Sequence, residues 1–141
     1  MRGNMGVHPE LSKRNQYRLP ADRYYELKHF CHQYARWKEE YRESTAPASP
    51  KLDGEVHGSG KGDSTESAGM KKAVLKSKIE LVEKTAVEAA GPVLAPFLLA
   101  GVTKKNIGYK YLRTVMHIPC GKDYYYKTYH YFFWLLDRKR E

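Results

Sequence analysis

The sequence predicts an all-α protein, a small helical bundle that ends in a helix-turn-helix. Apolar side chains recur at steps of three and four residues in several stretches, which is the spacing of one helix face. Proline and glycine stand where those stretches begin and end. The last stretch, residues 122–138, is longer than a typical strand and lacks strict alternation of polar and apolar residues, so we expect a helix there as well.

Residues 20–43 predict a long N-terminal amphipathic helix. Pro20 suits the first turn of a helix, and Asp22 is favoured near its N-terminus. Apolar or aromatic groups then follow at helical spacing, namely Tyr24, Leu27, Cys31, Tyr34, Trp37 and Tyr41. Charged residues occupy most positions between them, so we interpret this stripe as core, on a helix that is either continuous or broken near Tyr34.

Two segments lack the apolar residues that a folded core needs. Residues 1–19 are polar and aperiodic, and they predict a disordered N-terminal arm. Residues 44–69 contain almost no large apolar side chain. Such a segment cannot bury enough surface to offset its chain entropy, so it predicts a flexible linker.

Residues 70–141 predict a helical domain. Its first helix carries an apolar face formed by Leu75, Ile79, Val82, Ala86 and Ala89. Gly91 fits the C-cap of that helix, and Pro92 fits the first turn of the next one. The next helix is short and apolar on most sides, so we expect other helices to pack on it and Gly101 to end it.

A helix-turn-helix is expected at about residues 107–137. In its first helix we expect Lys110 and Arg113 to be exposed, and Tyr111 or Leu112 to be buried with Val115. Pro119 biases Ile118 away from helical dihedral angles, so the turn begins there, with the Ile118 side chain inserted between the two helices. In the last helix the expected core residues are Tyr125, Tyr129, Phe132, Phe133 and Leu136.

The charge distribution indicates a polyanionic partner. The net charge of the chain is +9, and residues 103–141 carry nine basic against three acidic side chains. A basic helix-turn-helix is suited to double-stranded DNA, with the start of its second helix in the major groove and the preceding helix across the backbone. The candidate DNA-binding residues are Lys104, Lys105, Lys110, Arg113, Lys122, Tyr124, Lys127, Thr128 and Tyr131.

Other function classes find little support in the sequence. The two cysteines lie far apart, and pairs such as His117 and Cys120 do not match a zinc-ligand spacing, so we expect neither a metal nor a cofactor. No catalytic constellation or phosphate-binding glycine loop is present, so we do not expect an enzyme. Residues 91–102 are the most apolar run and are too short to span a bilayer, so we expect a cytoplasmic protein with no membrane partner.

Three segments together resemble a known family. They are QYARWKEEY at 33–41, KIELVEKTAVE at 78–88 and YKYLRTVMHIPCGKDYYYKTYHYFFWLL at 109–136. This order resembles the small RinA/ArpU-like transcriptional regulators of phages and prophages, whose C-terminal part is similar to DNA-binding region four of sigma factors. The resemblance implies a transcriptional regulator in which residues 109–115 form the supporting helix and residues from Cys120 onward form the recognition helix. RNA polymerase and a second copy of the chain are further candidate partners.

A different class of function remains open beside this one. The last helix is rich in tyrosine, whereas recognition helices of the family tend to be rich in arginine. Tyr and Trp are enriched at protein interfaces. The alternative is therefore a phage-derived protein-interaction module, such as a host-enzyme inhibitor or a DNA-packaging component, that uses the aromatic surface of the last helix.

Overall fold

The computed structural model describes residues 11–45 and 61–141, with side chains from Ser67 onward in the second range. All regular structure in these ranges is helical, which confirms the all-α prediction. The helices are α1 (Ala21–Cys31), α2 (Tyr34–Thr45), α3 (Lys61–Thr103), α4 (Tyr109–Thr114) and α5 (Lys122–Lys139). The predicted arm at residues 1–10 and the predicted linker at residues 46–60 lie outside the described residues.

The N-terminal amphipathic helix is broken into α1 and α2. The break lies at His32 and Gln33, where the Gln33 amide donates to the Phe30 carbonyl at 3.2 Å instead of continuing the α-helical pattern. The stripe predicted to be core is largely buried, with Leu27 and Cys31 on α1 and Trp37 on α2 almost fully excluded from solvent. Because of the break, α1 packs on α5 and α3, whereas α2 runs along α3.

Helix α3 bends sharply at Gly91, which confirms the predicted helix boundary. Gly91 has φ 85°, a left-handed conformation that glycine adopts without strain, and Pro92 starts the segment after the bend. The helix begins at Lys61, so the prediction of linker for residues 61–69 is wrong. These residues have no apolar face of their own, but extending an existing helix costs far less than starting one.

The segment after the bend, residues 92–103, also differs from its predicted end. The helix continues past Gly101 to Thr103, whose hydroxyl donates to the Leu99 carbonyl at 2.6 Å. A Cβ on Gly101 would lie 2.0 Å from the hydroxyl oxygen of Tyr125. This glycine therefore permits close packing of α5 on α3, and does not mark a helix end.

Helix α5 forms the centre of the aromatic core. The five side chains predicted to face inward, Tyr125, Tyr129, Phe132, Phe133 and Leu136, are all buried. The ring of Phe133 meets those of Tyr24 and Tyr129 edge to face, each at 5.1 Å between centroids. The hydroxyls of Tyr24 and Tyr129 lie 2.8 Å apart, so these two buried polar groups satisfy each other.

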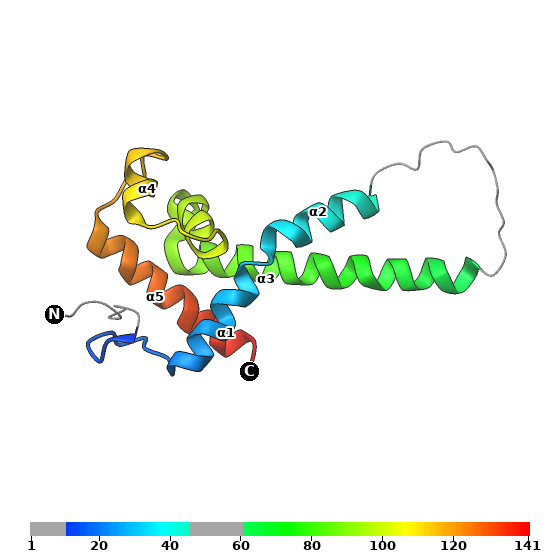
Figure 1. The fold of residues 1–141 in the computed structure, drawn as a ribbon, viewed down its shortest axis with the longest axis horizontal. Helices are drawn as coiled ribbons and strands as arrows, with labels where there is room; N and C mark the ends of the chain where they lie inside the picture. Colours follow the sequence, from blue (N-terminus) through cyan, green and yellow to red (C-terminus); the bar gives the residue numbers. More distant parts are fainter. Residues whose placement is uncertain (1–10, 46–60) are drawn as a thin grey trace.

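The molecule has two structurally distinct regions (Figure 1). In one, α2 and residues 61–90 of α3 lie side by side and extend away from the rest; we call this region the hairpin. In the other, α1, α4, α5 and residues 92–103 gather around the aromatic core, and the part formed by α4, the following turn and the start of α5 is called the α4–α5 end.

The stretch Ser67–Thr103 is long and apolar enough to cross a membrane, by length and composition alone. It is interrupted by the bend at Gly91, and its apolar face includes Ile79, Val82 and Leu98, which belong to the buried core cluster. A core helix of a globular protein has the same properties.

Candidate nucleic-acid interface

The turn between α4 and α5 is held by buried and hydrogen-bonded groups. Leu112 of α4 is fully buried, and its carbonyl accepts the Ile118 amide at 2.9 Å. The Ile118 side chain is buried, as predicted for the residue that is inserted between the helices. The Tyr109 hydroxyl donates to the Cys120 carbonyl at 2.6 Å, which ties the start of α4 to the start of α5. The order helix, turn, helix therefore has a defined geometry here.

One predicted burial in this region is wrong. Val115 is 54% exposed, because α4 already ends at Thr114 and the chain turns so that Ile118 takes the inward position. Tyr111 is exposed and Leu112 is buried, which resolves the choice that the sequence left open between them.

The start of α5 exposes three of the candidate residues. Lys122, Tyr124 and Lys127 face solvent, as predicted. Thr128 does not: it is 5% exposed, and its hydroxyl donates to the Tyr125 carbonyl at 2.7 Å. Position 128 lies three and four residues from Tyr125 and Phe132, on the buried face, and the local hydrogen bond satisfies the hydroxyl there. The expected outward orientation of Thr128 is therefore wrong.

Tyr131 is half-buried because a segment outside the helical domain covers it. The ring of Tyr17 lies 4.9 Å from the ring of Tyr131 and 5.5 Å from that of Trp134, between centroids. Leu19, two residues further on, is buried in the core. Residues 11–19 therefore pack on α5, and the prediction that this part of the N-terminus is disordered is wrong.

The basic candidates lie in three places. Lys110 and Arg113 are exposed on α4, and Lys122 and Lys127 are exposed on α5. Lys104 lines a groove beside α2. Lys105 lies near His32: the pKa of that imidazole is lowered mainly by desolvation, then by the charges of Lys28 and His29, and also by the charge of Lys105. The structure thus associates Lys104 and Lys105 with α1 and α2, apart from the start of α5.

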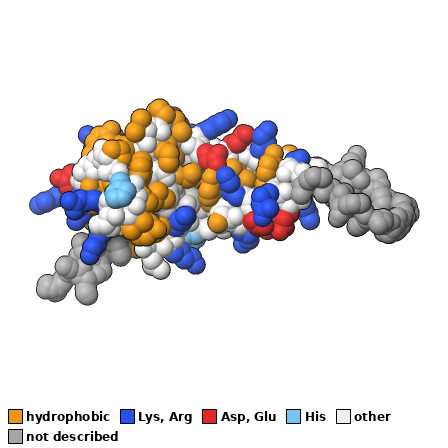
Figure 2. Space-filling view, turned by 90° about the horizontal axis from the view of Figure 1, so that it is seen from above, with side chains coloured by type: hydrophobic (Ala, Val, Ile, Leu, Met, Phe, Trp, Pro, Cys, Tyr) orange, Lys and Arg blue, Asp and Glu red, His pale blue; other side chains and the backbone are white. Residues whose placement is uncertain are grey.

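The cations of the α4–α5 end differ from those of the hairpin in their partners. Within residues 11–45 and 61–141, ion pairs engage many hairpin cations, such as Lys76 and Lys84 with Glu80, and Arg42 with Glu39. Within residues 11–45 and 67–141, whose side chains the structure describes, no ion pair involves Lys110, Arg113, Lys122 or Lys127. Figure 2 shows Lys and Arg predominating at the α4–α5 end on the left, with basic and acidic groups side by side along the hairpin.

A polar groove separates residues 12–17 from the start of α5. Its volume is about 760 Å³, and it is lined by Ser12, Arg14, Asn15, Gln16, Tyr17, Asp123, Tyr126, Lys127 and His130. Sequence reasoning missed this arrangement. The available signal was Leu11, Tyr17 and Leu19, three apolar residues in a polar segment, but a segment this short has no periodicity to read.

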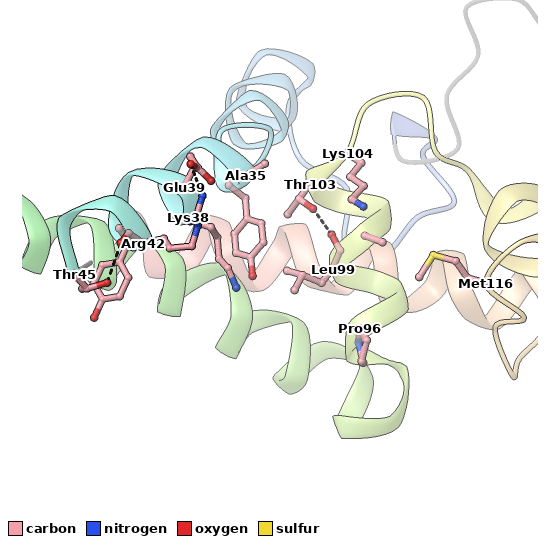
Figure 3. A pocket seen from close by; sticks show the side chains of 13 residues that line it. Ala35, Lys38, Glu39, Arg42, Thr45, Pro96, Leu99, Thr103, Lys104 and Met116 are labelled. Carbon is pink, nitrogen blue, oxygen red and sulfur yellow. Dashed lines mark hydrogen bonds and ion pairs between the residues drawn. The ribbon is translucent and has the colours of Figure 1, made fainter. Parts of the chain in front are cut away.

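A second groove, mainly apolar, lies between α2 and residues 92–103. Its volume is about 690 Å³ (Figure 3). Ala35 borders it on α2, Pro96 and Leu99 on α3, and Met116 at the turn after α4. Its charged border comprises Lys38, Glu39, Arg42 and Lys104. Figure 2 also shows a broad apolar area over the left part of the molecule. Tyr111 of α4 and Val115, which follows α4, are exposed large apolar residues.

The described residues offer little for metal or nucleophilic chemistry. No group of three or more His, Cys, Asp or Glu side chains among them is placed to hold a metal ion. Cys31 is fully buried, and desolvation raises the pKa of its thiol far above the usual range, so the reactive thiolate is disfavoured. Comparisons of the chain with protein-family models, with curated proteins and with solved structures find no match.

Proposed function

We propose that this protein binds double-stranded DNA through the α4–α5 end and regulates transcription of phage or prophage genes. The observation that carries the proposal is the set of exposed cations on α4 and at the start of α5 that have no acidic partner in the described residues. Unpaired cations gathered at one end of a molecule create a positive potential that attracts a polyanion. The regulatory role rests on the family resemblance of the sequence.

The helix order supports the assignment of contacts. In a helix-turn-helix, the residues at the start of the second helix reach base edges, and those of the first helix contact phosphates. Lys122, Tyr124 and Lys127 then face the groove of the duplex, where the two lysines reach guanine acceptors or the phosphates beside the groove, while Lys110 and Arg113 contact its backbone. The exposed hydroxyl of Tyr124 is available to a phosphate oxygen or a base edge.

Fluorescence anisotropy with a labelled random-sequence duplex tests the electrostatic part of this proposal. Each phosphate that a cation neutralises contributes about −0.9 to the slope of log K against log salt, so four contacts give about −3.5. A slope near zero, or no binding at micromolar protein in low salt, would contradict DNA binding. Selection of bound duplexes from a random pool tests the sequence specificity that a regulator needs, and a pool without enrichment would contradict regulation by operator recognition.

The second candidate function is a protein-interaction module, and the apolar groove between α2 and α3 favours it. Of the Tyr, Phe and Trp rings of α5, only that of Tyr124 is exposed, so the groove is the more extended apolar surface. Three basic and one acidic residue border it, so the occupant that fits best is an amphipathic helix of a partner protein with acidic residues beside its apolar face. RNA polymerase or a second copy of the chain are the partners to examine.

A pair of designed helical peptides tests this second candidate. Both carry leucines at helical spacing, and one is flanked by glutamates, the other by lysines. We expect the acidic peptide to bind more tightly, and Ala35→Glu at the groove edge to weaken it. Ala73→Glu on the exposed face of α3 is the matched control. Equal binding by both peptides, or no effect of Ala35→Glu, would contradict the assignment of the groove.

A further inference from the structure

We propose that residues 12–18 form a second edge of the polyanion-binding surface, across the polar groove from α5, and contact phosphates through Lys13, Arg14 and Arg18. This inference rests on the proposed binding of DNA and adds to it a segment that lies more than 100 residues from α5 in the sequence. The ligand is a nucleic-acid backbone, because the side chains that line the groove offer cations and hydrogen-bond donors to phosphate oxygens.

The segment is docked in a defined conformation. The Tyr17 ring contacts Tyr131 and Trp134, and the guanidinium of Arg138 lies 3.9 Å from the centroid of the Trp134 ring. The Tyr17 amide donates to the Asn15 side-chain oxygen at 2.8 Å, and the Arg18 amide donates to the Asn15 carbonyl at 3.1 Å. Aromatic contacts of this kind contribute about 0.5–1.5 kcal/mol beyond burial. The turn around Asn15 therefore holds the neighbouring cations in place before any ligand binds.

The sign of the charge on residues 11–20 shows whether this segment forms part of the binding surface or covers that surface and blocks it. Residues 11–20 contain three basic residues and no acidic one. A segment that masked a cationic surface would be expected to carry acidic residues, since these would take the place of the phosphates. Here Arg14 and Lys127 line the same groove, with Asp123 as the acidic residue beside them. Like charges that line one groove repel each other, and an anion placed between them relieves that repulsion.

The position of the groove agrees with this role. It opens beside Asp123, Tyr126 and Lys127, in the first turns of α5, which is the part of a recognition helix that lies nearest to the duplex. In the described residues, Lys13, Arg14 and Arg18 are exposed and form no ion pair. Their charges therefore remain available to an external anion.

The test uses the full chain and the salt dependence of duplex binding. We expect Arg14→Ala to make the slope of log K against log salt less negative by about one, the loss of one phosphate contact, with no change in thermal stability. Arg36→Ala is the matched control, because Arg36 is exposed on α2 and lies 3.7 Å from Glu40. It should leave the slope unchanged.

Tyr17→Ala tests the docking itself. Releasing the segment should weaken duplex binding and shift the fluorescence emission of Trp134, whereas Tyr17→Phe keeps the ring and should restore both. If Tyr17→Ala binds DNA more tightly, the segment is a cover, and our inference is overturned. If the wild type binds DNA and Arg14→Ala binds it with an unchanged slope, the inference fails while the proposed function stands. If the wild type binds no duplex, both fail.

Discussion

The hairpin and the α4–α5 end use charged residues in different ways. On the hairpin, Glu80 lies within 4.0 Å of both Lys76 and Lys84, so that its carboxylate offsets part of their positive charge locally. At the α4–α5 end, the corresponding lysines Lys122 and Lys127 are exposed and have no acidic partner among the described residues. Exposed pairs contribute little to stability, but they do cancel the local field. The difference indicates that basic residues of similar exposure serve solubility and helix stability in one region, and are available to a ligand in the other.

The two regions differ in packing as well. The aromatic core around α5 buries large rings from three helices, while the outer part of the hairpin exposes Met70 and Val74. A densely packed core fixes the rotation of α5 about its axis, so the backbone positions that carry the cations on the opposite face are held in place. The hairpin is held together by the contact between α2 and α3 alone, and it contributes less to positioning the cationic surface.

The largest expected effect comes from the core under the α4–α5 end. Phe132 is fully buried, so Phe132→Ala should lower the free energy of unfolding by about 3–5 kcal/mol. Val74→Ala on the exposed face of the hairpin should change it by less than about 0.5 kcal/mol. Urea unfolding followed by circular dichroism measures both. Similar losses for the two variants would contradict the difference in packing between the regions.

The next effect concerns the charges. The double variant Lys122→Ala, Lys127→Ala removes two unpaired cations, and the slope of log K against log salt for duplex binding should become less negative by about two. Lys76→Ala, Lys84→Ala removes two cations from the hairpin and should leave the slope unchanged. Fluorescence anisotropy over a salt series measures this. Equal reductions in both double variants would mean that binding follows the total charge of the protein and not its α4–α5 end.

A smaller effect is expected where the hairpin helices meet. The Tyr34 hydroxyl donates to the Glu83 carboxylate, and Lys38 lies 3.7 Å from the same group. Tyr34→Phe removes the hydrogen bond and should cost about 1 kcal/mol, since the site is only partly buried. The midpoint of urea unfolding reports this loss. The salt slope of DNA binding should not move, and a changed slope would show that the hairpin takes part in binding.

The smallest effect concerns pH at the junction of α1 and α2. Desolvation, followed by the charges of Lys28, His29 and Lys105, lowers the pKa of His32 below its usual 6.5, and the Nδ1 atom is buried without a hydrogen-bond partner. As the pH falls through 6.5, His32 takes up a proton in the unfolded state but not yet in the folded state. The free energy of unfolding therefore decreases from its neutral-pH value until the pH reaches the lower pKa of the folded state. The free energy of unfolding, measured with urea, should differ less between pH 7.5 and pH 5.5 for His32→Asn than for the wild type. An equal difference would contradict this origin of the pH dependence.

Much of the fold could be read from spacing in the sequence. The stripes on α1, α2 and the first part of α3, and the five inward residues of α5, follow the helical period closely enough to be assigned correctly. Gly91 and Pro92 marked the bend because their backbone restrictions act locally. Gly101 was misread because its role is to admit the Tyr125 hydroxyl, and that close approach depends on a residue from another helix.

The candidate site could be predicted only in part. The outward direction of Lys122, Tyr124 and Lys127 follows from the helical period of α5. Thr128 lies at the boundary between the buried and exposed faces of the same helix, and it was predicted to be exposed although it is buried. Lys104 and Lys105 looked continuous with α4 in sequence, yet the turn after α3 directs them towards α2 and His32. The docking of Tyr17 on α5 had no periodic signal at all.

The sequence by itself determined the helical class of the protein, the apolar faces and the excess of positive charge near the C-terminus, because these follow from composition and from the geometry of a single helix. Only the tertiary structure decided which cations remain unpaired, that residues 11–19 lie on α5, and that a groove opens between α2 and α3. These features depend on contacts between residues far apart in the chain, and no local pattern of residues encodes such contacts.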